Sequence, residues 1–168
     1  QRAHLLERGH RRHGGEHHAG LAVVGVSVHT EDEVRHDSYH PFETNIRLTG
    51  FQPHLHNRGK RQCIEAILPD GNTETISCAT WDFGWHIVYN YEDEVQPLLP
   101  KGTFLHTITW HDNSEGNRWN PDPRNWAGFG QRSSDEMAFT WTSYYELDDE
   151  EYEAAVAERQ KARQDADN

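Results

Sequence analysis

Short runs of β-branched and aromatic residues, separated by turn-forming residues, extend from about residue 21 to residue 146. This pattern constrains the fold of the chain more than any other feature of the sequence. Val, Ile, Thr, Tyr, Phe and Trp favour strands, whereas Gly, Pro, Asn and Asp between such runs favour turns. No convincing helical spacing of apolar residues occurs in this span. The sequence therefore predicts an all-β domain over residues 21–147, an antiparallel β-sandwich of jelly-roll-like form.

Two of the expected strands have well-defined faces, because alternate residues of a strand point to the same side. Along residues 103–110, one face holds Phe104, His106, Ile108 and Trp110. Along residues 137–145, one face holds Met137, Phe139, Trp141, Ser143 and Tyr145. The long stretch between these strands, residues 111–134, is rich in Asn, Pro, Gly and Trp, and loops of that length in a compact domain are more often functional than idle.

The two cysteines of the chain flank a predicted hairpin turn, Pro69-Asp70-Gly71-Asn72. A two-residue turn at Asp70-Gly71 places Cys63 directly opposite Cys78, whereas a type I turn with a Gly bulge sets Cys63 against Ser77. The sequence leaves both turns open. We expect a cross-strand disulfide between Cys63 and Cys78, which would imply an oxidising compartment.

Both ends of the chain differ in composition from the predicted sandwich. Residues 1–20 are dominated by Arg, Gly and His and are expected to be disordered, so the adjacent pair His17-His18 is interpreted as a chance occurrence. Residues 148–168 form an acidic tail with a predicted helix over residues 152–164, whose N-terminus the acidic run at residues 148–151 would stabilise. This short C-terminal helix is expected to lie outside the sandwich.

Charge and hydropathy exclude several classes of partner. Lys and Arg number 16 against 28 Asp and Glu, which gives a formal net charge of -12 and disfavours nucleic acid as a partner. The longest apolar run, Leu21-Ala22-Val23-Val24-Gly25-Val26, is far shorter than the roughly 20 residues that span a bilayer. The chain starts at Gln1 and shows no secretory signal, so we expect that processing or an incomplete sequence has removed its true N-terminus.

Two histidines in Gln52-Pro53-His54-Leu55-His56 form the first candidate site. Residues two apart on a strand point to the same face, so His54 and His56 can present both imidazoles to one metal ion without a special loop. By spacing alone the pair is also compatible with two histidines that merely line a face of a sheet.

Several short motifs follow the pair in a characteristic order. They are His54-Leu55-His56-Asn57-Arg58-Gly59-Lys60, Leu68-Pro69-Asp70-Gly71, Trp81-Asp82-Phe83-Gly84-Trp85, His111-Asp112-Asn113-Ser114, Asn120-Pro121-Asp122-Pro123 and Ser133-Ser134-Asp135-Glu136-Met137. Over about residues 35–147 this series resembles the C-terminal domain of the copper type II, ascorbate-dependent monooxygenases, which include peptidylglycine alpha-hydroxylating monooxygenase and dopamine beta-monooxygenase. It is most similar to bacterial relatives of uncharacterised substrate.

The resemblance implies a mononuclear copper held by His54, His56 and Met137, which is the only methionine of the chain. A thioether favours Cu(I), two imidazoles serve both oxidation states, and three ligands leave a position open for dioxygen. These residues would therefore be catalytic as well as metal-binding. The expected reaction is hydroxylation of a C–H bond in a small molecule, with ascorbate or another donor supplying electrons in the intact enzyme.

The chain departs from the family in its substrate contacts and its domains. The peptide-amidating member has Arg, Asn and Tyr at the positions of Gln52, Phe139 and Trp141, so a less polar substrate is expected here. The family's N-terminal copper domain is not found in this chain, and either that domain or a cytochrome domain is an expected partner. His111 is interpreted either as a second-shell or substrate contact or as a solvated turn histidine, and His86 as a core or surface histidine.

Two other functions are compatible with the same residues. One is a copper-holding or electron-transfer module, either alone or as part of a larger redox protein. The other is a non-catalytic sandwich that binds a ligand through tryptophans such as Trp119 and Trp126. For any of these functions, the expected disulfide favours a periplasmic or extracellular location.

Overall fold

The predicted all-β sandwich is confirmed by the computed structural model, which describes residues 17–22, 27–28 and 33–166. One sheet has the strand order β1-β11-β4-β7, with β8 also paired to β4. Its strands are β1 (His17–Ala22), β4 (Asn45–Leu55), β7 (Tyr89–Asn90), β8 (Leu98–Leu99) and β11 (Ala138–Leu147). The second sheet has the order β3-β9-β5-β6, formed by β3 (Val34–Pro41), β5 (Gly59–Ile67), β6 (Thr73–Thr80) and β9 (Phe104–His111). A small ribbon pairs β2 (Ser27–Val28) with β10 (Ala127–Gly128).

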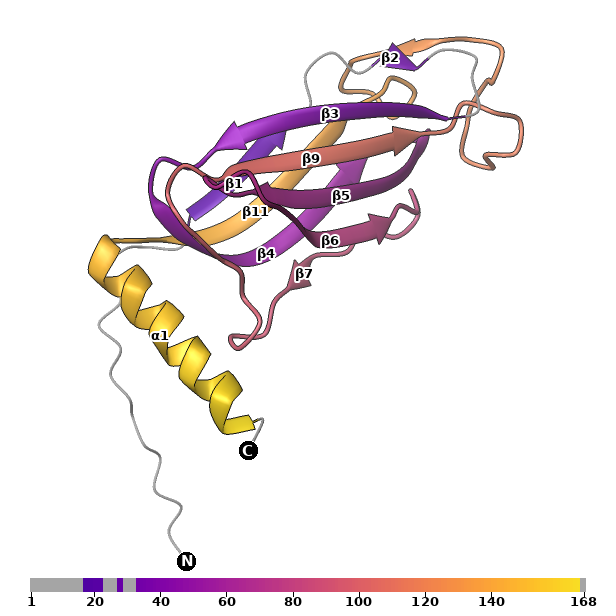
Figure 1. The fold of residues 1–168 in the computed structure, drawn as a ribbon. Coiled ribbons are helices and arrows are strands. Elements are labelled where there is room, and N and C mark those ends of the chain that lie inside the picture. The colour runs from indigo at the N-terminus through magenta and orange to yellow at the C-terminus, as the bar shows by residue number, and fades with distance from the viewer. Residues whose placement is uncertain (1–16, 23–26, 29–32, 167–168) are drawn as a thin grey trace, which may run out of the picture.

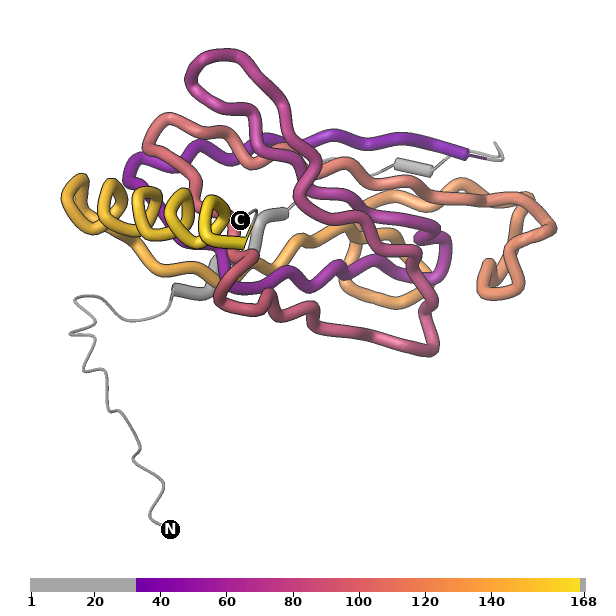
Figure 2. Tube along the Cα trace, turned by 60° about the horizontal axis from the view of Figure 1, so that its bottom comes forward, coloured from indigo at the N-terminus to yellow at the C-terminus, as the bar shows by residue number. Residues whose placement is uncertain are grey.

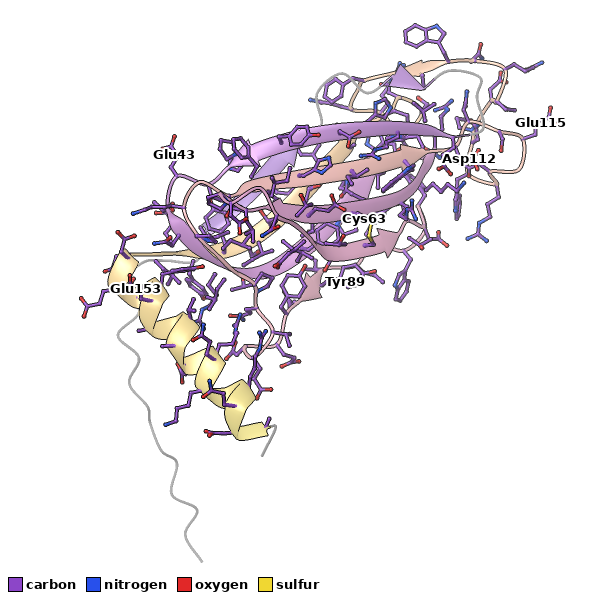
Figure 3. The ribbon with its side chains drawn as sticks, in the orientation of Figure 1. Glu43, Cys63, Tyr89, Asp112, Glu115 and Glu153 are labelled. Atoms are coloured by element: carbon purple, nitrogen blue, oxygen red, sulfur yellow. A yellow bond between two sulfur atoms is a disulfide. The ribbon has the colours of Figure 1, made fainter. Side chains whose placement is uncertain are left out.

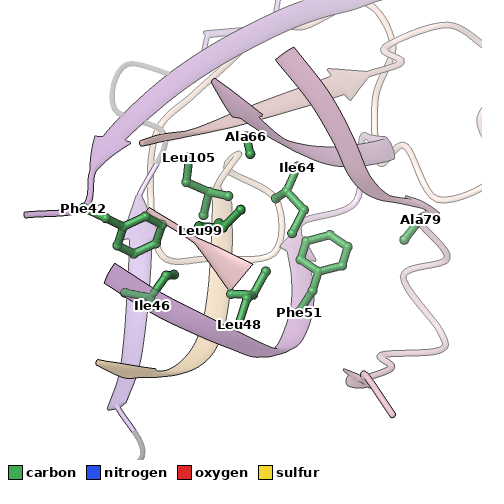
Figure 4. Close-up of a cluster of buried hydrophobic side chains, with 9 residues drawn as sticks. All are labelled: Phe42, Ile46, Leu48, Phe51, Ile64, Ala66, Ala79, Leu99 and Leu105. Atoms are coloured by element: carbon green, nitrogen blue, oxygen red, sulfur yellow. The ribbon is translucent and has the colours of Figure 1, made fainter. Parts of the chain in front are cut away.

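The two large sheets face one another and enclose the core (Figure 1). Within each sheet the paired strands are antiparallel, and the longest pairing is that of β4 with β11. A cluster of apolar side chains packs between the sheets (Figure 4). This cluster contains Phe42, Ile46, Leu48, Phe51, Ile64, Ala66, Ala79, Leu99 and Leu105.

The interior becomes more polar toward the loop of residues 112–136, although Leu55 and Ala138 are also buried there. Along the inner face of β9, the buried residues change from Leu105 to Thr107, Thr109 and finally His111. Gln62, on the inner face of β5, is also fully buried and donates to Thr109 Oγ1 at 3.1 Å. The apolar cluster therefore stabilises one end of the sandwich, while hydrogen bonds and a buried ion pair hold the end that carries the long loop.

The hairpin between β5 and β6 uses the type I turn with a Gly bulge. Gly71 donates to Leu68 O at 2.9 Å and has φ of 88°, and Leu68 donates to Asn72 O at 2.8 Å. This turn alone would set Cys63 against Ser77. A second register shift next to Ile64 leaves one extra residue on β6, and the cysteines become direct partners.

The expected disulfide between Cys63 and Cys78 is present, with a Cα–Cα distance of 4.1 Å (Figure 3). It joins neighbouring strands in the sheet formed by β3, β9, β5 and β6. A disulfide is compatible with an oxidising environment.

The predicted disorder of residues 1–20 is wrong at its C-terminal end, since His17–Ala22 forms β1 and pairs with β11. The sequence reasoning failed here because β1 adds to the edge of a sheet and gains backbone hydrogen bonds that composition does not reveal. The remainder of that segment, residues 1–16, lies outside the described residues. The adjacent histidines His17 and His18 are thus part of a strand, contrary to the expectation.

The predicted C-terminal helix is present as α1 (Asp149–Ala166). It begins at a capping box, in which Glu151 N–H donates to Asp148 Oδ1 at 2.8 Å and Asp148 N–H donates to Glu151 Oε2 at 3.0 Å. The helix projects from the end of the sandwich opposite the loop of residues 112–136 (Figure 2). Within the described ranges, no helix has both the length and the apolar character that crossing a membrane requires.

We predict that the double variant Cys63→Ala/Cys78→Ala loses about 3 kcal/mol of the free energy of unfolding, because a crosslink over 15 residues restricts the unfolded chain. Urea unfolding followed by far-ultraviolet circular dichroism measures the difference. Reductant should lower the stability of the natural chain and leave that of the double variant unchanged. Equal stabilities of the two oxidised proteins would contradict the prediction.

Candidate metal centre

The pairing of β4 with β11 brings together the three residues expected to bind copper. His54 lies on β4 opposite Phe139, and Leu55 lies opposite Ala138. Continuing this register by one residue places Met137 opposite His56, just beyond the ends of both strands. Directly opposed residues of an antiparallel pair point to the same face, so Met137 shares a face with the two histidines.

The two imidazoles lie side by side. Their ring centres are 5.5 Å apart and the ring planes are nearly perpendicular, at 81°. His54 and Met137 are half-buried, and His56 is buried with 6% of its surface exposed. The pair therefore lies at the border between the polar end of the sandwich and solvent.

Hydrogen bonds fix the orientation of His56. Its Nδ1 lies 3.2 Å from Asp135 O, and since a carbonyl oxygen can only accept, Nδ1 donates this hydrogen bond and Nε2 is the ring nitrogen left to bind a metal ion. The His56 carbonyl in turn accepts from Trp81 Nε1 at 3.2 Å and from Gly59 N–H at 3.0 Å. A hydrogen bond of this kind on the other ring nitrogen is typical of metal-binding histidines.

His54 is held in the uncharged form. Burial, followed by the neighbouring charges of His56 and His86, lowers its pKa below the usual value. A neutral imidazole is the form that binds metal ions. The side chain is therefore available as a ligand at neutral pH.

The three positions expected to contact substrate also lie on this face. Gln52 is the register partner of Trp141, next to the pair formed by His54 and Phe139. The rings of Phe139 and Trp141 are stacked, with centres 5.8 Å apart and an angle of 20°. Trp141 is 45% exposed, so the two rings form an aromatic surface beside the histidines that solutes can reach.

A third histidine, His86, lies beside the pair. The sequence reasoning did not predict this position. Its ring centre is 5.9 Å from that of His54 and 4.6 Å from that of Trp81. Its Nε2 donates to Phe83 O at 3.0 Å. A tight turn, in which Trp85 N–H donates to Asp82 O at 2.9 Å, brings this segment back toward β4. The motif Asp82-Phe83-Gly84-Trp85 predicts such a turn but not the side on which it lies.

His111 is fully buried, so the interpretation as a solvated turn histidine is wrong. It ends β9 on the inner face of the sheet, and its ring centre lies 5.3 Å from that of His36. Burial and then the charge of His36 lower its pKa to about 3. The Met137 backbone opposes this shift in pKa. Neither ring nitrogen has a hydrogen-bond partner among the described residues, although Glu136 Oε2 lies 3.6 Å from His111 Nε2. A second-shell role for His111 stays a prediction.

A buried ion pair anchors the long loop next to the candidate site. Arg58 Nη1 and its backbone N–H contact Glu136 Oε1 at 3.3 and 2.9 Å, and Arg58 Nε donates to Asn113 Oδ1 at 2.7 Å. The two charged side chains are 3% and 0% exposed. Burial raises the pKa of Glu136 to about 7, which the charge of Arg58 opposes. Because Glu136 precedes Met137, this network fixes the start of β11.

Several polar atoms near this network lack hydrogen-bond partners among the described residues. They are His36 Nε2, Gln62 Oε1, Thr107 Oγ1, Glu136 Oε2, Thr140 Oγ1 and both ring nitrogens of His111. No group of three or more His, Cys, Asp or Glu side chains in the described ranges is arranged to hold a metal ion. The set formed by His54, His56 and Met137 has only two ligands of those types and a thioether as the third.

Comparisons with known proteins do not identify a family. No family model matches the chain, and no curated protein matches it. Among solved structures, it is similar to a crystal structure of the T13 viral particle of infectious bursal disease virus, with a TM-score of 0.34 and 10% identity over 79% of this chain and 36% of that chain. For the Gx and Gt strains of that virus the TM-scores are 0.32 and 0.30, with 11% and 8% identity over 79% of this chain and 40% and 42% of those chains. The chain thus spans about two fifths of the length of these viral chains, and at such TM-scores the likeness carries no argument.

We predict that Arg58→Met lowers the free energy of unfolding by about 3–5 kcal/mol, because it leaves Glu136 buried without its charged partner. Arg118→Met is a matched control, since Arg118 pairs with Asp82 at 2.8 Å on the exposed surface and its loss should change stability little. Urea unfolding of both variants provides the comparison. Similar effects for the two arginines would show that the buried pair has no special role.

We also predict that His111 makes the natural chain sensitive to acid. Its pKa is lower in the folded state than in the unfolded state, so the unfolded chain binds the proton first, and stability is lost as pH falls from about 6.5 toward 3. His36, His56, Arg58 and Glu136 surround the ring and are retained in the variant His111→Phe. The difference between the two stability profiles from pH 7 to pH 4.5 therefore measures the effect of His111 and of its coupling to these neighbours. Parallel profiles would rule out this assignment.

Proposed function

We propose that this chain is a copper-binding domain of the ascorbate-dependent monooxygenase type, with one copper ion held by His54, His56 and Met137. The observation that carries the proposal is the β4–β11 register, which aligns Phe139 with His54 and Met137 with His56. Met137 is 81 positions from His56 and 83 positions from His54 in the chain, and the register brings all three to one face of one sheet.

The donor set fits copper. His56 offers the lone pair of Nε2, because its Nδ1–H is committed to Asp135 O. His54 is neutral, and Met137 adds a soft, uncharged sulfur. Two imidazoles and a thioether suit a copper ion that cycles between its two oxidation states, and when bound, the copper supplies one-electron chemistry and a site for dioxygen.

The role of the protein is then to position a substrate C–H bond beside the metal ligands. The stacked rings of Phe139 and Trp141 lie next to His54 in the register and offer an apolar surface for a small, weakly polar molecule. Gln52 is the polar group on the same face, and an amide favours hydrogen bonding over binding a carboxylate as an ion pair. The arrangement supports a small apolar or aromatic substrate.

The intact system requires an electron source, which we propose to be ascorbate or a partner domain that holds a second copper or a cytochrome. The disulfide is compatible with the oxidising conditions of a periplasmic or extracellular protein. A copper-holding or electron-transfer module would use the same three ligands, and it would differ in not consuming dioxygen when reduced copper protein and substrate are mixed.

X-ray absorption of the Cu(I)-loaded full chain tests the ligand set. We expect one sulfur and two nitrogen ligands in the natural chain, with loss of the sulfur contribution in Met137→Leu. The sulfur signal is diagnostic because Met137 is the only methionine and both cysteines are in the disulfide. Histidines elsewhere in the chain, including those before residue 17, can add nitrogen but not sulfur.

Phe139→Leu is the matched control, since it changes the neighbouring side chain on the same face of β11 and removes no donor atom. It should retain the sulfur signal. A natural chain without a sulfur ligand, or a Met137→Leu variant with an unchanged spectrum, would refute the proposed site.

A further inference from the structure

A groove of about 550 Å³ is lined by residues of α1, of β6 at the edge of one sheet and of β8 in the other sheet. This groove and the candidate copper site lie at opposite ends of β4. Leu147, two residues before the start of α1, pairs with Asn45 at one end of β4, and His54 lies at the other end. The volume is within the range of about 300–1,000 Å³ that is usual for small-molecule sites. This groove is therefore a second candidate site, independent of the first.

Apolar side chains form most of its walls. From α1, Tyr152 and Val156 face the groove with the helical spacing of four residues, and Ile76 and Leu98 face it from the strands. Val95, on the loop between β7 and β8, is 65% exposed and also lines it. An apolar ligand can thus exclude water from surfaces that the protein leaves partly uncovered.

Positive charge collects at one end of the groove. Arg159 and Arg163 line it, on the same side of α1 as Val156. Burial and then the charges of Arg47 and Arg163 lower the pKa of Arg159, which shows that three guanidinium groups lie near one another. One carboxylate, Glu74 on β6, also lines the groove, and it has no ion pair with these arginines.

The arginines at the groove have no carboxylate partner among the described residues, a property that they share with Arg61, which stacks on Trp110. The other described arginines that form ion pairs have a carboxylate at 3.3 Å or less, namely Arg35, Arg58, Arg118, Arg124 and Arg132. In the described part of the chain, Arg47, Arg159 and Arg163 have none, although the formal net charge is -12. Three uncompensated cations beside an apolar groove are complementary to an anion with an apolar tail.

We propose that the groove between α1, β6 and β8 binds a free amphipathic carboxylate, such as a medium-chain fatty acid. The tail lies against Ile76, Val95 and Val156, and the carboxylate accepts hydrogen bonds from Arg163 and is attracted by Arg47 and Arg159. Arg159 also has a positioning role, since its Nη1 donates to Gln96 O at 2.6 Å and ties α1 to the loop before β8.

Decanoate, below its micelle-forming concentration, is a suitable probe for isothermal titration calorimetry with the full chain in the absence of copper. We expect saturable binding at one site, and affinity at least about tenfold weaker for Arg163→Gln, which is the effect of losing one charge-assisted hydrogen bond. Lys161→Gln is the matched control, because it removes a positive charge from the same helix at a residue that does not line the groove. It should bind decanoate as the natural chain does.

Two comparisons separate the carboxylate from the tail. Decanol has the same alkyl chain without the charge and should bind more weakly than decanoate, while acetate has the charge without the chain and should not bind measurably. Val156→Asp should abolish binding, and circular dichroism verifies that α1 remains helical. Absence of decanoate binding to the natural chain, equal affinity for decanol, or equal losses for Arg163→Gln and Lys161→Gln would overturn the proposal. None of these results bears on the copper ligands, which lie at the other end of β4.

Discussion

The antiparallel pairing of β4 with β11 is the contact on which the rest of the molecule depends. It runs from the pair of Asn45 and Leu147 to the pair of Leu55 and Ala138, through one bulge next to Ser143. Its inner face contributes Leu48 and Phe51 to the apolar cluster, and its outer face carries His54 and Phe139. Because successive strand residues alternate between faces, a slip of one residue would exchange core and site together. Fold and candidate site are therefore specified by one register.

A buried ion pair stabilises the end of the sandwich that lies next to His54 and Phe139. Arg58 and Glu136 form a buried ion pair, and the surrounding interior contains His111 and Thr109 where the other end has Leu105 and Ile64. A buried pair gains less from its charge attraction than it loses in hydration unless further hydrogen bonds satisfy both groups. Here Asn113 and Ser134 supply those bonds to Arg58, whereas Glu136 Oε2 has no hydrogen-bond partner among the described residues. The same network holds in place the loop that leads to Met137.

Strand positions and side-chain faces were predictable because they depend on local alternation. The hairpin around Asp70 and the helix after Leu147 follow from turn and capping residues in the same way. Burial of His111 and proximity of His86 to His54 were not predictable, since both depend on how distant segments pack. The family resemblance supplied the choice of Met137, and the structure adds a register that is compatible with that choice but tests neither the metal nor the reaction.

Because β6 has one extra residue, the disulfide depends on the pairing of β5 with β6 beyond the turn, and not on the turn alone. The turn at Gly71 by itself aligns Cys63 with Ser77, and only the register shift near Ile64 brings Cys78 opposite Cys63. The two sulfur atoms therefore meet when the strands have paired beyond the shift, and not when the turn has closed. Oxidation of the thiols thus locks in a completed sheet edge, and a chain in which only the turn has formed keeps both thiols reduced and open to exchange.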